Sequence, residues 1–146
     1  MRKIIIDTDP GQDDALALMT AFGAKQELNV LGVTCVAGNV PLDLTSVNAL
    51  KICELSGVFS VPVFRGSEAP LKRKLITAEH VHGKTGLDGT DLSVKKKELE
   101  RTDAVDFIVE CTEKYRDEKI TICALGPLTN IAKVLKQDTV LTDSIE

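Results

Sequence analysis

The chain has 146 residues, enough for one domain with a hydrophobic core, and its 43% hydrophobic and 27% charged residues are ordinary for a globular protein. The net charge of −4 argues against a nucleic-acid partner, and no apolar stretch approaches the length of a membrane span. The N-terminus lacks the layout of a signal peptide, and the cysteines lie far apart within apolar runs, so we expect buried thiols and a cytoplasmic protein.

Strand and helix signals alternate along the chain, which predicts an α/β fold with an open, mostly parallel sheet and helices on both faces. The predicted strands cover residues 4–6, 28–36, 61–64 and 120–125. The predicted helices cover residues 13–22, 42–56 and 103–116, and a last helix opens at Gly126-Pro127 with proline in its first turn.

Residues 65–97 carry glycine, proline and polar side chains with weak periodicity, so we expect one long loop region there. Loops of this length inside a domain are usually functional or mobile. The run of three lysines at its end is followed by Glu98 and Glu100, which favours a solvated connection over a basic patch.

The most informative segment follows the first predicted strand. Residues 7–14 read DTDPGQDD, which places four carboxylates within eight residues, at Asp7, Asp9, Asp13 and Asp14. A turn at the Pro-Gly pair puts these acids on a loop at the carboxyl end of a strand, where ligands bind in open α/β sheets. Adjacent carboxylates repel one another unless a cation neutralises them, and oxygen ligands favour Ca²⁺ or Mg²⁺. In the alternative interpretation Asp13 or Asp14 caps the next helix, which accounts for one or two of the acids only.

This segment, after an apolar strand, resembles the signature of the inosine-uridine-preferring nucleoside hydrolases. Three further segments agree with that family in order and approximate spacing: residues 34–40 (TCVAGNV), 80–89 (HVHGKTGLDG) and 125–132 (LGPLTNIA). The resemblance covers essentially the whole chain. It implies a hydrolase of the glycosidase type that cleaves the N-glycosidic bond of ribonucleosides, giving free base and ribose, with bound Ca²⁺.

The resemblance also implies roles for the residues of a metal site. Asp9 would bind Ca²⁺ and act as general base toward a water molecule. Asp14 and the backbone carbonyl of Leu125 would be further metal ligands, and Asp7 would brace the loop.

Substrate contacts follow from the same resemblance. Asp13 would hold ribose hydroxyls, and Asn39 would bind the ribose, although its Gly-Asn pair also fits a plain turn. His82 would lie near the nucleobase and donate a proton to the leaving group, whereas a histidine in a loop is otherwise more often structural or solvated. We expect Asp88 to be a turn residue, and Asn130 to support the geometry of the metal loop.

The family continues for about as long again beyond residue 146, and its third metal-binding Asp and a neighbouring His lie in that part. Residues 1–146 would therefore be the N-terminal part of a nucleoside hydrolase domain, and we expect little or no activity from them alone. The apolar edge of half a sheet invites pairing with another strand. We therefore expect a homo-oligomer, or a missing C-terminal half as the partner.

Two other functions stay open. The chain would be a non-catalytic fragment that binds a metal ion or ribose, or a phosphatase of the haloacid-dehalogenase type, which also begins with a strand followed by Asp-x-Asp and uses Mg²⁺. In the phosphatase Asp7 would be the nucleophile and Asp9 the acid/base. Gly11 stands where that family has Thr or Val, and the second pair of acids has no role in it.

Overall fold

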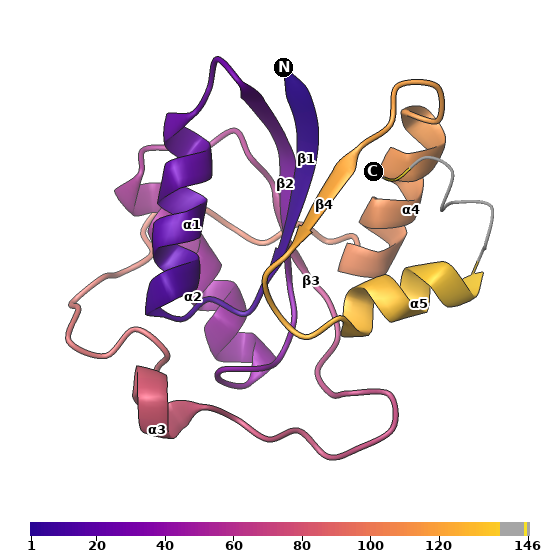
Figure 1. Cartoon of the computed structure of the whole chain (residues 1–146). Helices are drawn as coiled ribbons and strands as arrows, with labels where there is room; N and C mark the ends of the chain where they lie inside the picture. Colours follow the sequence, from indigo (N-terminus) through magenta and orange to yellow (C-terminus); the bar gives the residue numbers. More distant parts are fainter. Residues whose placement is uncertain (138–144, 146) are drawn as a thin grey trace.

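The computed structural model describes residues 1–137 and residue 145. In this part of the chain β1 (Arg2–Thr8), β2 (Leu28–Cys35), β3 (Val63–Arg65) and β4 (Thr121–Ala124) form one sheet in the order β3-β2-β1-β4. All neighbouring strands run parallel. The helices are α1 (Gln12–Gly23), α2 (Leu42–Leu55), α3 (Glu79–His82), α4 (Ala104–Lys114) and α5 (Thr129–Gln137). The predicted parallel α/β fold is confirmed (Figure 1).

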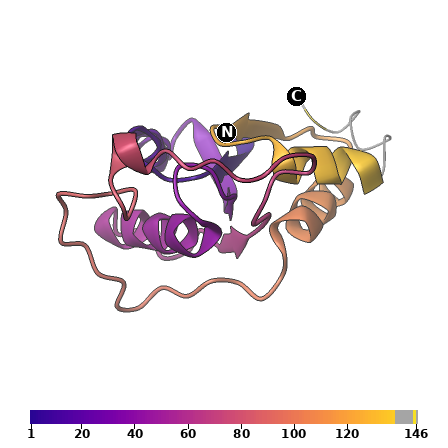
Figure 2. The same cartoon turned by 90° about the horizontal axis from the view of Figure 1, so that it is seen from below.

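Each face of the sheet has its own core, because successive side chains of a strand point to opposite faces. Ile4 and Ile6 of β1 pack with α1 and α2, whereas Ile5 between them packs with α4 and α5. Figure 2, the view from below, shows the two pairs of helices on the two sides of the strands. The predicted helices on both faces are therefore present.

The order of the strands creates a crevice beside β1. From β1 the chain proceeds outward to β2 and β3, and it then returns to place β4 on the other side of β1. Open α/β sheets bind ligands at such a reversal, outside the carboxyl ends of the strands. The segment that carries Asp9, Asp13 and Asp14 (residues 9–14, called the acidic loop below) follows β1. It meets the turn after β4 at this point.

Several predicted boundaries differ from the structure. The first strand is Arg2–Thr8, longer than the predicted residues 4–6. The third strand is Val63–Arg65 instead of residues 61–64, because it pairs only with the end of β2. The last helix begins at Thr129 and not at Gly126-Pro127, because the first helical hydrogen bond runs from the amide of Ala132 to the carbonyl of Leu128 (2.8 Å). Helix α3 was not predicted, since four residues are too few to show a helical period.

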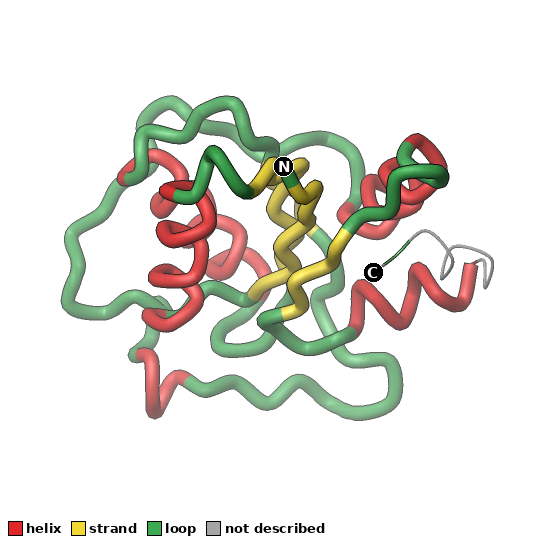
Figure 3. Tube along the Cα trace, turned by 45° about the horizontal axis from the view of Figure 1, so that its top comes forward, coloured by secondary structure: helices red, strands yellow, loops and turns green. Residues whose placement is uncertain are grey.

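The long connection between β3 and α4 runs around the outside of the domain (Figure 3), and most of its residues are exposed or partly exposed. Near its end the Glu54 carboxylate accepts hydrogen bonds from the backbone amides of residues 95–97 (2.7–3.1 Å). Lys97 is only 9% exposed, and its ammonium donates to the carbonyls of Phe59 and Val61. The predicted solvated connection is therefore wrong at Lys97, whose ammonium group binds the segment between α2 and β3.

Cys35, Cys53 and Cys111 are buried, and Cys123 is partly buried; none forms a disulfide. Burial raises the pKa of the Cys53 and Cys111 thiols to about 11, so they stay protonated and pack as small apolar side chains. Among the described residues, no helix has both the length and the apolar character needed to cross a membrane.

Candidate metal and ribose site

The acidic loop lies at the carboxyl edge of the sheet, between β1 and the start of α1 (Figure 2). Asp9 and Asp14 are each only 5% exposed, whereas the Asp13 side chain is 80% exposed. The loop thus turns two of its carboxylates inward and leaves one facing outward.

Asn39, which follows β2, joins the two inward carboxylates. Its backbone amide donates to Asp9 Oδ2 (2.7 Å), and its side-chain Nδ2 donates to the carbonyl of Asp9 (2.9 Å) and to Asp14 Oδ2 (3.4 Å). The same Asp14 oxygen accepts from the amide of Gly11 (3.2 Å), and Thr8 Oγ1 donates to the other (2.6 Å). The helix-capping interpretation is therefore correct for Asp14 but does not cover Asp9. Asn39 does more than form a turn, because it hydrogen-bonds to both Asp9 and Asp14 and so fixes the loop.

Burial raises the pKa of Asp9 from 3.8 to about 7, and the negative charges of Asp14 and Asp13 act in the same direction. The hydrogen bond from the amide of Asn39 opposes the shift only in part. A buried carboxylate beside two others is a position where a cation is stabilising.

Two glycines make room for the Asp9 carboxylate. A Cβ on Gly38 would overlap Asp9 Oδ2, and a Cβ on Gly126 would lie 2.7 Å from Asp9 Oδ1. Both glycines sit directly after strands that flank β1, so the backbones of three neighbouring segments close around one carboxylate.

Asp7 is fully buried, and its Oδ2 accepts hydrogen bonds from Thr34 Oγ1 (2.7 Å) and Asn130 Nδ2 (2.8 Å). Burial raises its pKa to about 6, against the effect of these two donors. Its contacts join β1 to β2 and α5, so it braces the strands below the loop. No substrate reaches a residue buried to this extent, which excludes Asp7 as the nucleophile of a phosphatase.

Leu125 lies directly after β4, at the edge of the site. Together with Asp13, Asp14 and Ala17 it lines a hollow of about 210 Å³ at the crevice between β1 and β4. The predicted backbone ligand and the exposed acid of the loop therefore face the same space.

His82, on α3, lies against the acidic loop. A Cβ on Gly11 would be 2.7 Å from His82 Nδ1, so only glycine lets the ring approach this closely. Its Nε2 lies 4.0 Å from Asp13 Oδ1, and its side chain is 14% exposed. His80 is exposed and apart from the site. Asp88 accepts hydrogen bonds from the amides of Lys84 and Thr85, which confirms it as a turn residue.

Among residues 1–137 and residue 145, no three His, Cys, Asp or Glu side chains form a group that by itself could hold a metal ion. The donors predicted from the sequence are the carboxylates of Asp9 and Asp14 and the carbonyl of Leu125. Ca²⁺ takes six to eight oxygen ligands, so water, substrate hydroxyls or further protein oxygens would complete its shell. Oxygen donors beside a buried, like-charged pair fit such a hard cation.

Sequence reasoning missed Thr8 and Thr34 as supports of the acids; it predicted the supporting role of Asn130, but not its partners. The Asn130 amide donates to Asp7 Oδ2 and to the carbonyl of Cys35 (3.0 Å), and its oxygen accepts from the amide of Ser67 (2.9 Å). These partners come from three distant segments. The only available signal was an Asn in the first turn of a predicted helix.

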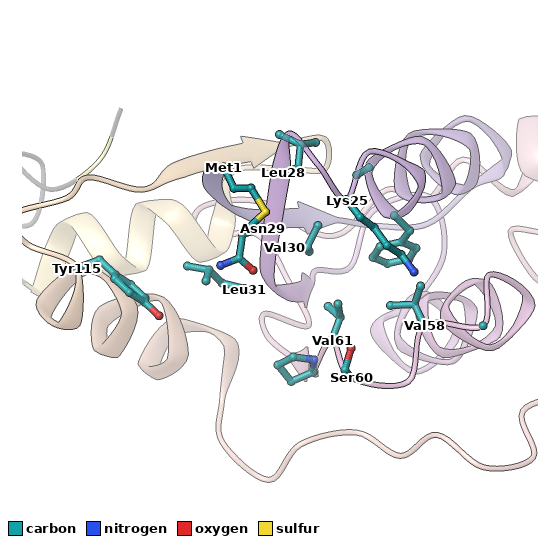
Figure 4. Close-up of a pocket in the computed structure, with 14 residues that line it drawn as sticks. Met1, Lys25, Leu28, Asn29, Val30, Leu31, Val58, Ser60, Val61 and Tyr115 are labelled. Carbon is teal, nitrogen blue, oxygen red and sulfur yellow. The ribbon is translucent and has the colours of Figure 1, made fainter.

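The larger hollow of the domain lies away from the acidic loop. It has about 530 Å³ and lies where β1 and β2 begin, between Met1, Lys25, Val61 and Tyr115 (Figure 4). It holds none of the predicted site residues, so size alone does not identify the functional site.

Comparison with known proteins identifies the family. The family model described as inosine-uridine preferring nucleoside hydrolase matches residues 4–146. The pyrimidine-specific ribonucleoside hydrolase RihB of Escherichia coli O9:H4 is 41% identical over 144 residues, covering 99% of this chain and 45% of the relative. Uridine nucleosidase 1 of Arabidopsis thaliana is 43% identical over 145 residues, covering 99% and 43%. The solved plant nucleoside hydrolase PpNRh1 superposes with a TM-score of 0.91 at 37% identity, covering 99% and 45%. The chain thus spans less than half the length of these relatives.

Proposed function

The chain belongs to the inosine-uridine-preferring nucleoside hydrolase family, and from this premise we propose that it serves the Ca²⁺-dependent hydrolysis of ribonucleosides to free base and ribose. The observation that carries the proposal is the clamp of Asn39 on both Asp9 and Asp14, with His82 facing the same loop. Three separate segments of the chain meet there, at the reversal of strand order.

The cation would be held by Asp9, Asp14 and the carbonyl of Leu125. Bound Ca²⁺ would neutralise the acidic loop and make a neighbouring water easier to deprotonate. Asp9 would be the base that takes the proton from this water, because its carboxylate is buried and is fixed by the amide of Asn39.

The sugar and base would be handled by residues that face outward. Asp13 accepts hydrogen bonds from ribose hydroxyls, since its carboxylate is exposed and borders the hollow. Asn39 supports the ribose from the other side of the loop. His82 protonates the departing base, and its Nε2 lies on the Asp13 side of the loop.

The relatives leave the choice of base open for this chain. RihB is named as pyrimidine-specific and the Arabidopsis relative as a uridine nucleosidase, so the test offers both uridine and inosine. Release of reducing sugar is measured with Ca²⁺ and with a chelator, for the chain, for Asp9→Asn and for Asp91→Asn, an exposed carboxylate outside the site. We expect little turnover from residues 1–146 alone, and any that is seen should require Ca²⁺ and fall by at least about 10²-fold in Asp9→Asn but not in Asp91→Asn.

A second function is favoured by one specific observation. In this alternative the chain by itself binds Ca²⁺ or ribose weakly, without turnover. The described residues contain no group of three His, Cys, Asp or Glu side chains that could hold a metal ion, so the metal site is incomplete. Calorimetric Ca²⁺ binding that is lost in Asp9→Asn, with no sugar release, would support it. If the chain shows neither Ca²⁺ binding nor turnover, both functions are refuted.

We also propose a pairing partner and a compartment. Among the described residues, the side of β4 away from β1 makes only a bridge between Ile120 and Ile145, so a strand of a second copy or of further chain has room to pair there. Four cysteines without a disulfide suit a reducing compartment, the cytoplasm.

A further inference from the structure

Asn48 connects the acidic loop to the segment that carries His82. We propose that this side chain, on α2, is a positioning residue that holds residues 78–87, and with them His82, in place against the loop. The catalytic consequence rests on the proposed function, in which His82 protonates the leaving base. The positional claim does not depend on it.

The contacts of Asn48 are few and specific. The side chain is 1% exposed, and its Nδ2 donates to the carbonyl of Pro10 (3.1 Å) and to the carbonyl of Thr85 (2.7 Å). Pro10 belongs to the acidic loop, and Thr85 follows His82 by three positions. One amide group therefore uses both of its protons to join two loops that are far apart in the sequence.

The chemistry of the position requires a donor. Asn is unfavourable in the interior of a helix, because its amide competes for backbone hydrogen bonds. An aspartate here would point a carboxylate oxygen at two carbonyl oxygens, and an apolar side chain would leave both carbonyls without their donor. The occurrence of Asn in the middle of α2 is thus explained by its two tertiary contacts.

The neighbouring backbone is adapted to this contact. Gly86 has φ +83°, and a Cβ there would lie 2.9 Å from Asn48 Nδ2 and 3.2 Å from the carbonyl of Pro10. Leu87, the next residue, is 4% exposed and belongs to the same core as α2. The chain after His82 is therefore pressed onto Asn48 by a glycine that allows close approach and by a buried leucine.

The other end of the segment has its own attachment. The amide of Ala78 donates to the carbonyl of Asn39 (2.9 Å), directly before α3. His82 thus lies between two attachments, one to Asn39 and one to Asn48 through Thr85. Figures 1 and 2 show α3 beside the start of α1. Loss of the Asn48 attachment leaves only the first of the two.

The test follows His82 by NMR in the whole 146-residue chain, with chelator and without substrate. The chain has two histidines, and the exposed His80 provides an internal reference for a solvated ring. In Asn48→Ala and Asn48→Asp we expect the His82 ring signals to move toward those of His80. We also expect amide hydrogen exchange at Ala78 and at Gly86, each of which donates to a backbone carbonyl, to become at least about tenfold faster, the effect of losing a pair of hydrogen bonds.

Three controls keep the result specific. Thr112→Ala removes another buried side-chain hydrogen bond, on α4 across the sheet, and should leave the His82 signals unchanged. The amides of Val33 and Val36, bonded within the sheet region, should keep their exchange rates in all variants that fold. Gly86→Ala leaves α2 intact and pushes the segment off Asn48, so it should reproduce the movement of His82 even if the Asn48 variants fail to fold.

Two results would overturn the proposal. One is a folded Asn48 variant, or a folded Gly86→Ala chain, with unchanged His82 signals. The other is exchange that accelerates equally at Val33 and Ala78, which would make Asn48 a residue of general stability. Because no substrate is present, absence of nucleoside hydrolysis would count against the proposed function alone.

Discussion

Without metal, the Asp9→Asn chain should be more stable than the parent chain. With Ca²⁺ bound, it should be less stable than the parent chain. Asp9 is 5% exposed, and burial together with the charges of Asp14 and Asp13 raises its pKa from 3.8 to about 7. The side chain of Asn has nearly the same shape, and its oxygen can still accept the hydrogen bond from the amide of Asn39. The substitution therefore removes an unfavourable charge while it keeps the geometry.

The direction of the pH dependence follows from the raised pKa. Below about pH 4 the carboxyl group is protonated in both the folded and the unfolded chain, so its contribution to stability is complete. As the pH rises toward 7 and beyond, the unfolded chain releases the proton first, and stability is lost. The shift corresponds to about 4 kcal/mol at 1.36 kcal/mol per pKa unit. Relaxation of the loop and entry of water around the charge reduce the expected value to about 2 kcal/mol.

Thermal unfolding followed by circular dichroism provides the assay. At pH 8 with chelator, Asp9→Asn should unfold about 4–8 °C above the parent chain, and the difference should disappear near pH 4. With saturating Ca²⁺ the order should reverse, because ligand binding stabilises only the chain that keeps the carboxylate. Asp91→Asn, at an exposed position, should match the parent throughout. A variant that is less stable than the parent at pH 8 with chelator, or a difference that does not vary with pH, would refute the reasoning.

Two further substitutions test the packing around the acids. Gly38→Ala should displace the Asp9 carboxylate, which lowers the Ca²⁺ affinity measured by calorimetry and costs about 1–3 kcal/mol of stability. Gly23→Ala, at a position with open space around it, should change neither quantity. Equal behaviour of the two variants would contradict the close approach of Gly38 to Asp9. Asn130→Ala should cost about 3 kcal/mol or more in urea unfolding, because its three buried partners lose their bonds, while the exposed Asn29→Ala should be near neutral. A loss below about 1 kcal/mol for Asn130→Ala would show that these partners find other bonds.

The location of the site could be predicted from local sequence, whereas the contacts that support it could not. The run of acids after an apolar strand was enough to predict a ligand loop at the carboxyl edge of the sheet. The assignment of Asp9, Asp13, Asp14, Leu125 and His82 to specific ligand roles stays a prediction. Their placement around one crevice supports it.

The sequence by itself determined the order of the elements, the parallel sheet with helices on both faces, and the family. These properties follow from patterns that repeat over a few residues, such as the apolar runs of buried strands and the Pro-Gly turn. A signature of contiguous residues is equally visible without a structure.

Only the tertiary structure decided how the site is supported. Asp7 is paired inside the domain with Thr34 and Asn130, and Asn48 joins two loops through one amide group. The turn before α5 was also settled there, because the carbonyl of Asp7 accepts hydrogen bonds from the amides of Leu125 and Gly126. Such contacts join residues tens of positions apart, and a side-chain amide carries no periodic signal that would reveal its partner. The fold determines them because the parallel sheet brings the carboxyl ends of distant strands to one edge.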